Sequence, residues 1–88
     1  MITRQVEIIN KTGLHARPAS DFVLAAKKYE SKISIRRLDG EAVNAKSIVR
    51  LLAEGIGQGT QIELIIDGPD EEAAATELVA LIESGFGE

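Results

Sequence analysis

The apolar residues of this 88-residue sequence switch between two periods along the chain, and those periods limit the folds that it can adopt. Over residues 2–9 and 61–67 they alternate with polar residues, which is the pattern of a strand with one buried face. Over residues 16–28 they recur three and four positions apart, which predicts a helix with one buried face. Arg4 and Ile9 interrupt the first alternation near its margins.

Turn and capping residues predict the remaining elements. Asp39-Gly40 predicts a hairpin between strands over residues 32–38 and 41–44. Ser47 precedes an apolar run and Gly55 follows it, so we expect a short helix with Ser47 as its N-cap. A last helix is expected from about residue 70 to Gly85, with the acids of residues 70–72 at its positive end. Its core stripe consists of Ala74, Ala75, Leu78, Val79, Leu81 and Ile82.

The resulting order of elements is βαββαβα. Strands with one apolar face, interrupted by amphipathic helices, predict a two-layer α/β sandwich in which helices cover one face of a mostly antiparallel sheet. The periodicity leaves the strand order open, because a ferredoxin-like arrangement of the first six elements fits it equally well. No linker interrupts the pattern, so we expect residues 1–88 to form a single domain.

The composition excludes several classes of function. Without cysteine the chain has no disulfide, thiolate metal site or cysteine nucleophile, and its single histidine would bind a metal only weakly. A net charge of −4 and three aromatic residues argue against nucleic-acid binding. No apolar run reaches the roughly 18 residues of a membrane span. We therefore expect a cytoplasmic protein with no metal and no cofactor. Three alternate glycines after position 54 fit a helix cap and turn better than a nucleotide loop, since no Walker lysine follows them.

The segment Gly13–Ser20 is the candidate site. Pro18 is tolerated in the first turn of a helix, which places His15 at or next to the N-cap. The first amides of a helix lack internal partners and attract an anion, which Arg17 could also bind through two hydrogen bonds. Because an imidazole is largely uncharged at neutral pH, this arrangement suggests phosphoryl chemistry at His15. A surface histidine that merely begins the helix fits the same residues.

Two motifs extend this interpretation. The run Gly13-Leu14-His15-Ala16-Arg17-Pro18-Ala19, followed by Ala45-Lys46-Ser47-Ile48 and a glycine-rich turn, closely resembles the HPr phosphocarriers of the bacterial phosphotransferase system. The resemblance covers essentially the whole chain, with one extra residue in the hairpin at residues 37–40. It implies an open-faced sandwich with sheet order 1-4-2-3 and three helices on one face.

The resemblance also implies a function. Such a protein is a carrier rather than a true catalyst: His15 would accept a phosphoryl group on Nδ1 from enzyme I and pass it to enzyme IIA domains, with Ala16 and Arg17 binding the phosphate. Ser47 would be the regulatory position that HPr kinase/phosphorylase modifies in some members. The segments 6–8, 10–11 and 84–86 are similar to NPr, the carrier of the nitrogen-related branch, so the branch stays open.

Docking residues follow from the same resemblance. The expected surface consists of Leu14, Ile48, Val49, Leu52, Gly55 and Ile56, rimmed by Arg17, Lys27, Lys28 and Arg50. Some of these apolar side chains could instead fill the core. We expect a monomer. A regulatory binding protein that acts through Ser47 without a phosphoryl relay is the second hypothesis, and an enzyme domain would need an acid–base pair or cofactor motif that the sequence lacks.

Overall fold

A computed structural model describes residues 1–88 and has the predicted order of elements. The strands are β1 (Ile2–Glu7), β2 (Lys32–Arg37), β3 (Val43–Asn44) and β4 (Gln61–Asp67). The helices are α1 (Ala16–Lys27), α2 (Ile48–Ala53), α3 (Glu71–Glu83) and the short 3-10 turn η1 (Gly85–Gly87). The strands form one antiparallel sheet in the order β1-β4-β2-β3, so the strand order that the resemblance implied is confirmed.

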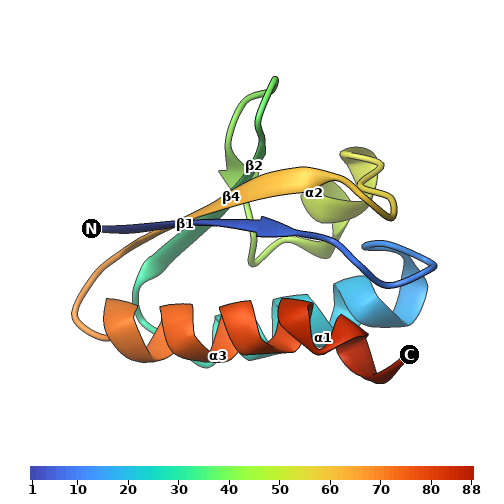
Figure 1. Ribbon diagram of the computed structural model, residues 1–88. Coiled ribbons are helices and arrows are strands. Elements are labelled where there is room, and N and C mark those ends of the chain that lie inside the picture. Colours follow the sequence, from blue (N-terminus) through green and yellow to red (C-terminus); the bar gives the residue numbers. More distant parts are fainter.

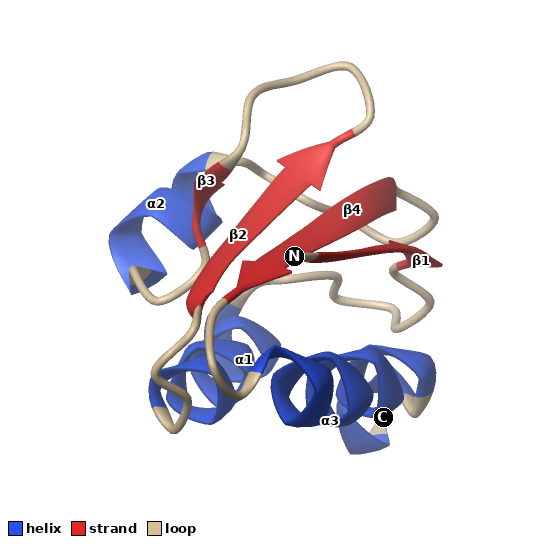
Figure 2. Ribbon diagram, turned by 90° about the vertical axis from the view of Figure 1, so that its left-hand side faces the viewer, coloured by secondary structure: helices blue, strands red, loops and turns tan.

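The sheet has one covered face and one open face. The helices α1 and α3 lie side by side beneath it (Figures 1 and 2), and α2 lies at the β3 edge (Figure 2). In β4, Ile62, Leu64 and Ile66 are fully buried, while Gln61 and Glu63 alternate with them on the open side. The period-two pattern therefore predicted the covered face correctly. Ile8 stays buried beyond the end of β1.

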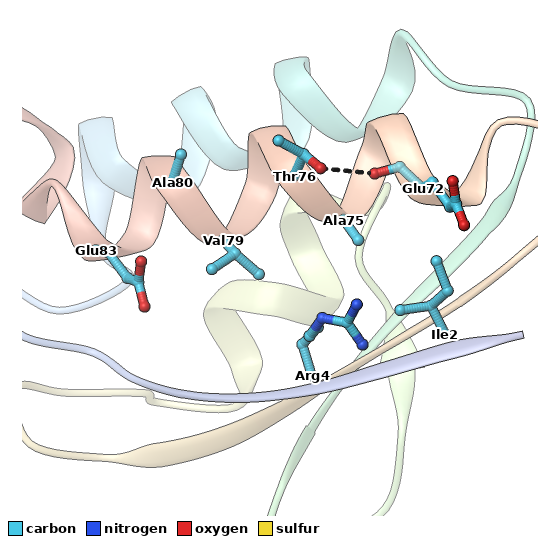
Figure 3. A pocket seen from close by; sticks show the side chains of 8 residues that line it. All are labelled: Ile2, Arg4, Glu72, Ala75, Thr76, Val79, Ala80 and Glu83. Atoms are coloured by element: carbon cyan, nitrogen blue, oxygen red, sulfur yellow. Dashed lines mark hydrogen bonds between the residues drawn. The ribbon is translucent and has the colours of Figure 1, made fainter.

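Arg4 interrupts the alternation of β1 because it occupies a position on the helix-facing side. It pairs in register with Leu64, and its side chain extends toward α3 beside Val79 (Figure 3). There it lines a cavity of about 390 Å³ between β1 and α3. Since β1 is an edge strand, an inward-pointing charge of this kind disfavours pairing with a foreign strand.

The short helix α2 is held by capping at both ends. Ser47 is its N-cap, and the hydroxyl oxygen accepts a hydrogen bond from the Arg50 amide at 3.3 Å, as predicted. At the other end Gly55 has a φ of +61°, and Arg37 Nη1 donates to the Glu54 carbonyl at 3.0 Å. Leu51 is the one buried residue of the helix, which leaves its remaining apolar side chains near the surface.

Asp70 links the turn that precedes α3 to the turn that follows α1. Its carboxylate accepts hydrogen bonds from the Glu30 and Ser31 amides at 2.9 Å each and from the Ser31 hydroxyl. It is the N-cap residue of α3 but makes no capping hydrogen bond, so its side chain serves the neighbouring turn. The Ser31 hydroxyl, together with the Glu30 amide, holds the pKa of Asp70 below its usual value.

This depressed pKa predicts a pH dependence of stability. A carboxyl whose pKa is lower in the folded than in the unfolded state stabilises above the unfolded pKa, near 3.8, and the contribution is lost as pH falls through the folded value. We expect Asp70→Asn to lower the melting temperature at pH 7 and to lose less on acidification toward pH 3. Parallel thermal melts of both proteins across this range measure the difference. If the melting temperatures of both proteins fell equally with pH, Asp70 would contribute nothing to acid unfolding.

Candidate functional site

His15 is the N-cap of α1, as predicted. Its backbone is extended, its side chain is exposed, and the imidazole makes no capping hydrogen bond. Ala16, the first residue of the helix, has a φ of +48°, a left-handed conformation that is unusual without glycine. The amides of Ala16 and Arg17 donate no hydrogen bond within the chain. His15 therefore directly precedes two free amides at the positive end of a helix, which is a suitable place for an anion.

The guanidinium of Arg17 is also available. Arg17 is exposed, and its guanidinium makes no ion pair. It lines a cavity of about 330 Å³ between the first turn of α1 and η1, together with Asp21 and Phe86. A bound anion at His15 could thus be met by backbone amides and by a planar cationic group.

The C-terminal segment is a part of this region that sequence reasoning missed. The Glu88 carboxylate accepts a hydrogen bond from the Thr12 hydroxyl at 2.6 Å, and that bond lowers its pKa. The cavity beside Arg17 is lined by Glu88 as well. No local pattern could have shown this contact, because the two residues lie 76 positions apart.

Two predicted docking residues belong to the core instead. Leu14 is 0% and Ile56 is 1% exposed, so neither can contact a partner. The reason is that the loop before α1 packs on the loop after α2: the Leu14 amide donates to the Ile56 carbonyl at 2.8 Å, and both side chains join the buried cluster. The prediction that they line a docking surface was wrong.

The other apolar docking residues are accessible. Ile48 is 36%, Val49 is 72% and Leu52 is 39% exposed. Gly55 is exposed at the end of α2. The backbone contact between Leu14 and Ile56 places this end of α2 beside the loop that carries His15. An apolar patch of Ile48, Val49 and Leu52, hereafter the α2 patch, therefore accompanies the candidate phosphate site.

The predicted basic rim is only partly free. Lys28 Nζ lies 2.6 Å from Glu77 Oε2, so this lysine is already paired. Lys27 and Arg50 are exposed and make no ion pair. Leu24, which was not predicted as a site residue, is 63% exposed and lies seven positions after Arg17, on the same side of α1. The sequence pattern could have indicated that Leu24 is exposed, because this leucine lies outside the buried stripe of the helix.

The structure contains no cluster of three or more His, Cys, Asp or Glu side chains that could hold a metal ion. None of its helices has the length and apolar character to cross a membrane.

Comparison with known proteins places the chain among phosphocarriers. A family model described as "PTS HPr component phosphorylation site" matches residues 2–84. The phosphocarrier protein HPr of Treponema pallidum is 42% identical over 88 residues, which cover 100% of this chain and 99% of that protein. The HPr-like protein Crh of Halalkalibacterium halodurans is 49% identical over 83 residues, covering 94% of this chain and 98% of Crh.

Solved structures agree with these matches. A crystal structure of HPr from Thermoanaerobacter tengcongensis superposes with a TM-score of 0.96 at 50% identity and covers 100% of this chain and 98% of that one. A second structure from that organism, described as an HPr dimer, has a TM-score of 0.79 at 52% identity and covers 94% of each chain. The chain therefore belongs to the HPr family, the phosphocarrier component of the phosphotransferase system, whose members carry a phosphoryl group rather than catalyse a reaction of their own.

Proposed function

We propose that His15 accepts a phosphoryl group from enzyme I and passes it to enzyme IIA domains. The observation that carries this proposal is the exposed imidazole at the N-terminus of α1 beside two free amides and the unpaired Arg17. A lone pair on Nδ1 attacks phosphorus while the bond between phosphorus and enzyme I breaks. The phosphohistidine bond then breaks in turn when an acceptor group on the IIA domain attacks.

The electrostatics of the site suit a carrier. Phosphorylation adds nearly two negative charges, which the Ala16 and Arg17 amides and the Arg17 guanidinium can stabilise by charge-assisted hydrogen bonds. Contacts at an exposed helix end and with an exposed arginine are together worth about 1–3 kcal/mol. Such modest stabilisation keeps the phosphoryl group transferable, and the partner supplies most of the stabilisation of the transition state.

Docking is proposed to use the α2 patch with Leu24 and the free cations around it. Ile48, Val49 and Leu52 offer apolar area next to the loop of His15, and Arg17, Lys27 and Arg50 offer positive charge. A basic rim of this kind fits acidic surfaces on enzyme I and on IIA domains and accelerates their encounter.

The test is phosphorylation of the wild-type protein. Incubation with enzyme I, phosphoenolpyruvate and magnesium is expected to add the mass of one phosphoryl group. Proteolysis under mildly alkaline conditions should place the label on the peptide that contains His15, and acid should remove it, as phosphohistidine requires. An unchanged mass, or an acid-stable label on another peptide, would reject the proposal.

Ser47 is proposed as a regulatory position. A phosphate there would leave α2 intact, because a helix N-terminus tolerates an anion, while it would place negative charge beside the docking surface. We therefore expect Ser47→Asp to slow phosphorylation of His15 by enzyme I, measured as initial rates. The matched variant Ser47→Ala removes the cap, at about 1 kcal/mol, without adding charge and should keep the wild-type rate. Equal rates for wild type and Ser47→Asp would refute this role.

The second candidate function is that of a regulatory protein that acts through Ser47 and relays no phosphoryl group. The 49% identity to the HPr-like protein Crh supports this candidate. Phosphorylation of Ser47 by HPr kinase/phosphorylase together with no labelling of His15 would support it. Transfer from phosphorylated His15 to sugar-type or nitrogen-type IIA proteins would assign the branch.

We further propose that residues 1–88 act as a single domain in the cytoplasm and that the protein is a monomer. Light scattering in solution would distinguish a monomer from the dimer described for a relative.

A further inference from the structure

Asn10 is an unusual residue in this core. It is 4% exposed, and only one other polar residue, Ser31, is buried. Ser31 lies in the network with Asp70 at the C-terminal end of α1. Asn10 lies in the loop between β1 and α1, five residues before His15. A buried amide in the loop that carries the candidate phosphate acceptor requires a physical explanation.

Two of the hydrogen bonds of Asn10 bind Gly13. The Asn10 carbonyl accepts from the Gly13 amide at 3.1 Å, and Asn10 Nδ2 donates to the Gly13 carbonyl at 2.9 Å. The same Nδ2 lies 3.3 Å from the Thr12 hydroxyl. Both main-chain polar groups of Gly13 are therefore held by Asn10. The next amide, that of Leu14, is fixed by the Ile56 carbonyl, so the backbone is fixed up to the residue before His15.

One side-chain atom of Asn10 has no partner within the chain. Asn10 Oδ1 is buried and has no hydrogen-bond partner, which is unfavourable for a carbonyl oxygen. Exchanging the amide oxygen and nitrogen would point Oδ1 at the Gly13 carbonyl, where two acceptors would repel each other. An apolar side chain would avoid the unpaired oxygen but would lose the bond to Gly13. What asparagine contributes here, and an apolar side chain could not, is the bond from Nδ2 to the Gly13 carbonyl.

We propose that Asn10 is a positioning residue for phosphoryl transfer. By holding Gly13, it sets the direction in which the chain enters α1 and thereby the placement of the His15 imidazole relative to the free amides of Ala16 and Arg17. This inference rests on the proposed function of His15. A reacting group must be held close to the attack geometry, and a misplacement of about 1 Å can cost up to a hundredfold in rate.

The test compares Asn10→Ala and Asn10→Asp with Ser31→Ala. Asn10→Asp keeps the shape and replaces the donor by an acceptor, whereas Asn10→Ala removes the side chain and gives a second variant should the aspartate variant fold poorly. Ser31→Ala removes the other buried polar side chain at the far end of α1, about 18 Å away along the 12-residue helix. It is therefore a destabilised control with an undisturbed loop. All proteins are assayed well below their melting temperatures.

We expect the Asn10 variants to change kcat much more than KM. With phosphoenolpyruvate as donor and each variant as phosphoryl acceptor, the kcat of enzyme I should fall about tenfold for both Asn10 variants, and its KM for them should change less than about twofold, because the docking residues are untouched. Ser31→Ala should keep both constants within about twofold of wild type despite a lower melting temperature. Wild-type kcat in both Asn10 variants, or a tenfold loss in Ser31→Ala as well, would overturn the proposal.

Amide chemical shifts distinguish a positioning role of Asn10 from a general loss of stability. On phosphorylation, the Ala16 and Arg17 amide resonances of the wild type should move downfield as they donate to the phosphate, and these shifts should be at least halved in the Asn10 variants but not in Ser31→Ala. Full wild-type shifts in the Asn10 variants would contradict the proposal. If wild type accepts phosphate at His15 and the Asn10 variants match it, only the positioning role fails. If wild type accepts none, the proposed function itself fails and this inference with it.

Discussion

His15→Ala is expected to accept no phosphoryl group from enzyme I under conditions that fully label the wild type. The chain has one histidine and no cysteine, so no other side chain offers an equivalent nitrogen or sulfur nucleophile. The imidazole is exposed and makes no capping bond, so its removal should change the free energy of unfolding by less than about 0.5 kcal/mol. Intact-mass measurement after incubation checks the labelling.

Arg17→Ala is the matched control for this variant. It removes a neighbouring exposed side chain that makes no ion pair. This variant should be labelled more slowly but to completion, because the nucleophile remains. Urea unfolding of both variants shows that the loss is chemical and not a loss of fold. Any label retained by His15→Ala would mean that a different residue accepts the phosphoryl group.

Gly13→Ala is expected to lower the free energy of unfolding by about 3 kcal/mol, because a left-handed backbone and a steric clash both oppose it. Gly13 has a φ of +65°, and a Cβ there would lie 2.5 Å from the Ile56 carbonyl oxygen and 2.6 Å from Gly57 Cα. Both atoms are backbone, so neither can move without shifting the loop after α2. Urea titration of the variant measures the loss.

Gly55→Ala separates the two contributions to this loss. Gly55 has a nearly equal φ of +61°, but a Cβ there would have nothing within 4 Å. Only the backbone preference remains, and we expect a loss of about 1 kcal/mol. Equal losses for the two variants would mean that the two loops are not packed as closely as the structure shows.

The features that the sequence predicted well depend on neighbouring residues. Ser47 caps α2 because its hydroxyl meets an amide three residues later, and His15 begins α1 because Pro18 fits only the first turn. The alternation in β4 likewise follows from the pleat of a single strand. Each of these could be recognised within about ten residues of sequence.

The features that the sequence did not predict depend on distant segments. Leu14 and Ile56 were expected on the surface, but the packing of their two loops buries them. Asp70 was expected only to complement the helix dipole, yet its carboxylate holds the turn at Ser31. Arg37 was expected only in a hairpin strand, yet it reaches the last turn of α2. In each case the partner lies 17 or more positions away, where local patterns carry no information.

The open face of the sheet is a suitable place for a label that reports the binding of partners. Gln5 on β1 is exposed, and it pairs in register with Glu63, which lies on the open face of the sheet between the buried residues of β4. Because the chain has no cysteine, a thiol introduced at Gln5 would be unique and could carry a single fluorophore or attach the molecule to a surface. The label would lie on the side of the sheet opposite the helices, so it would report binding of a partner to α1 and α2 without occupying the contact itself.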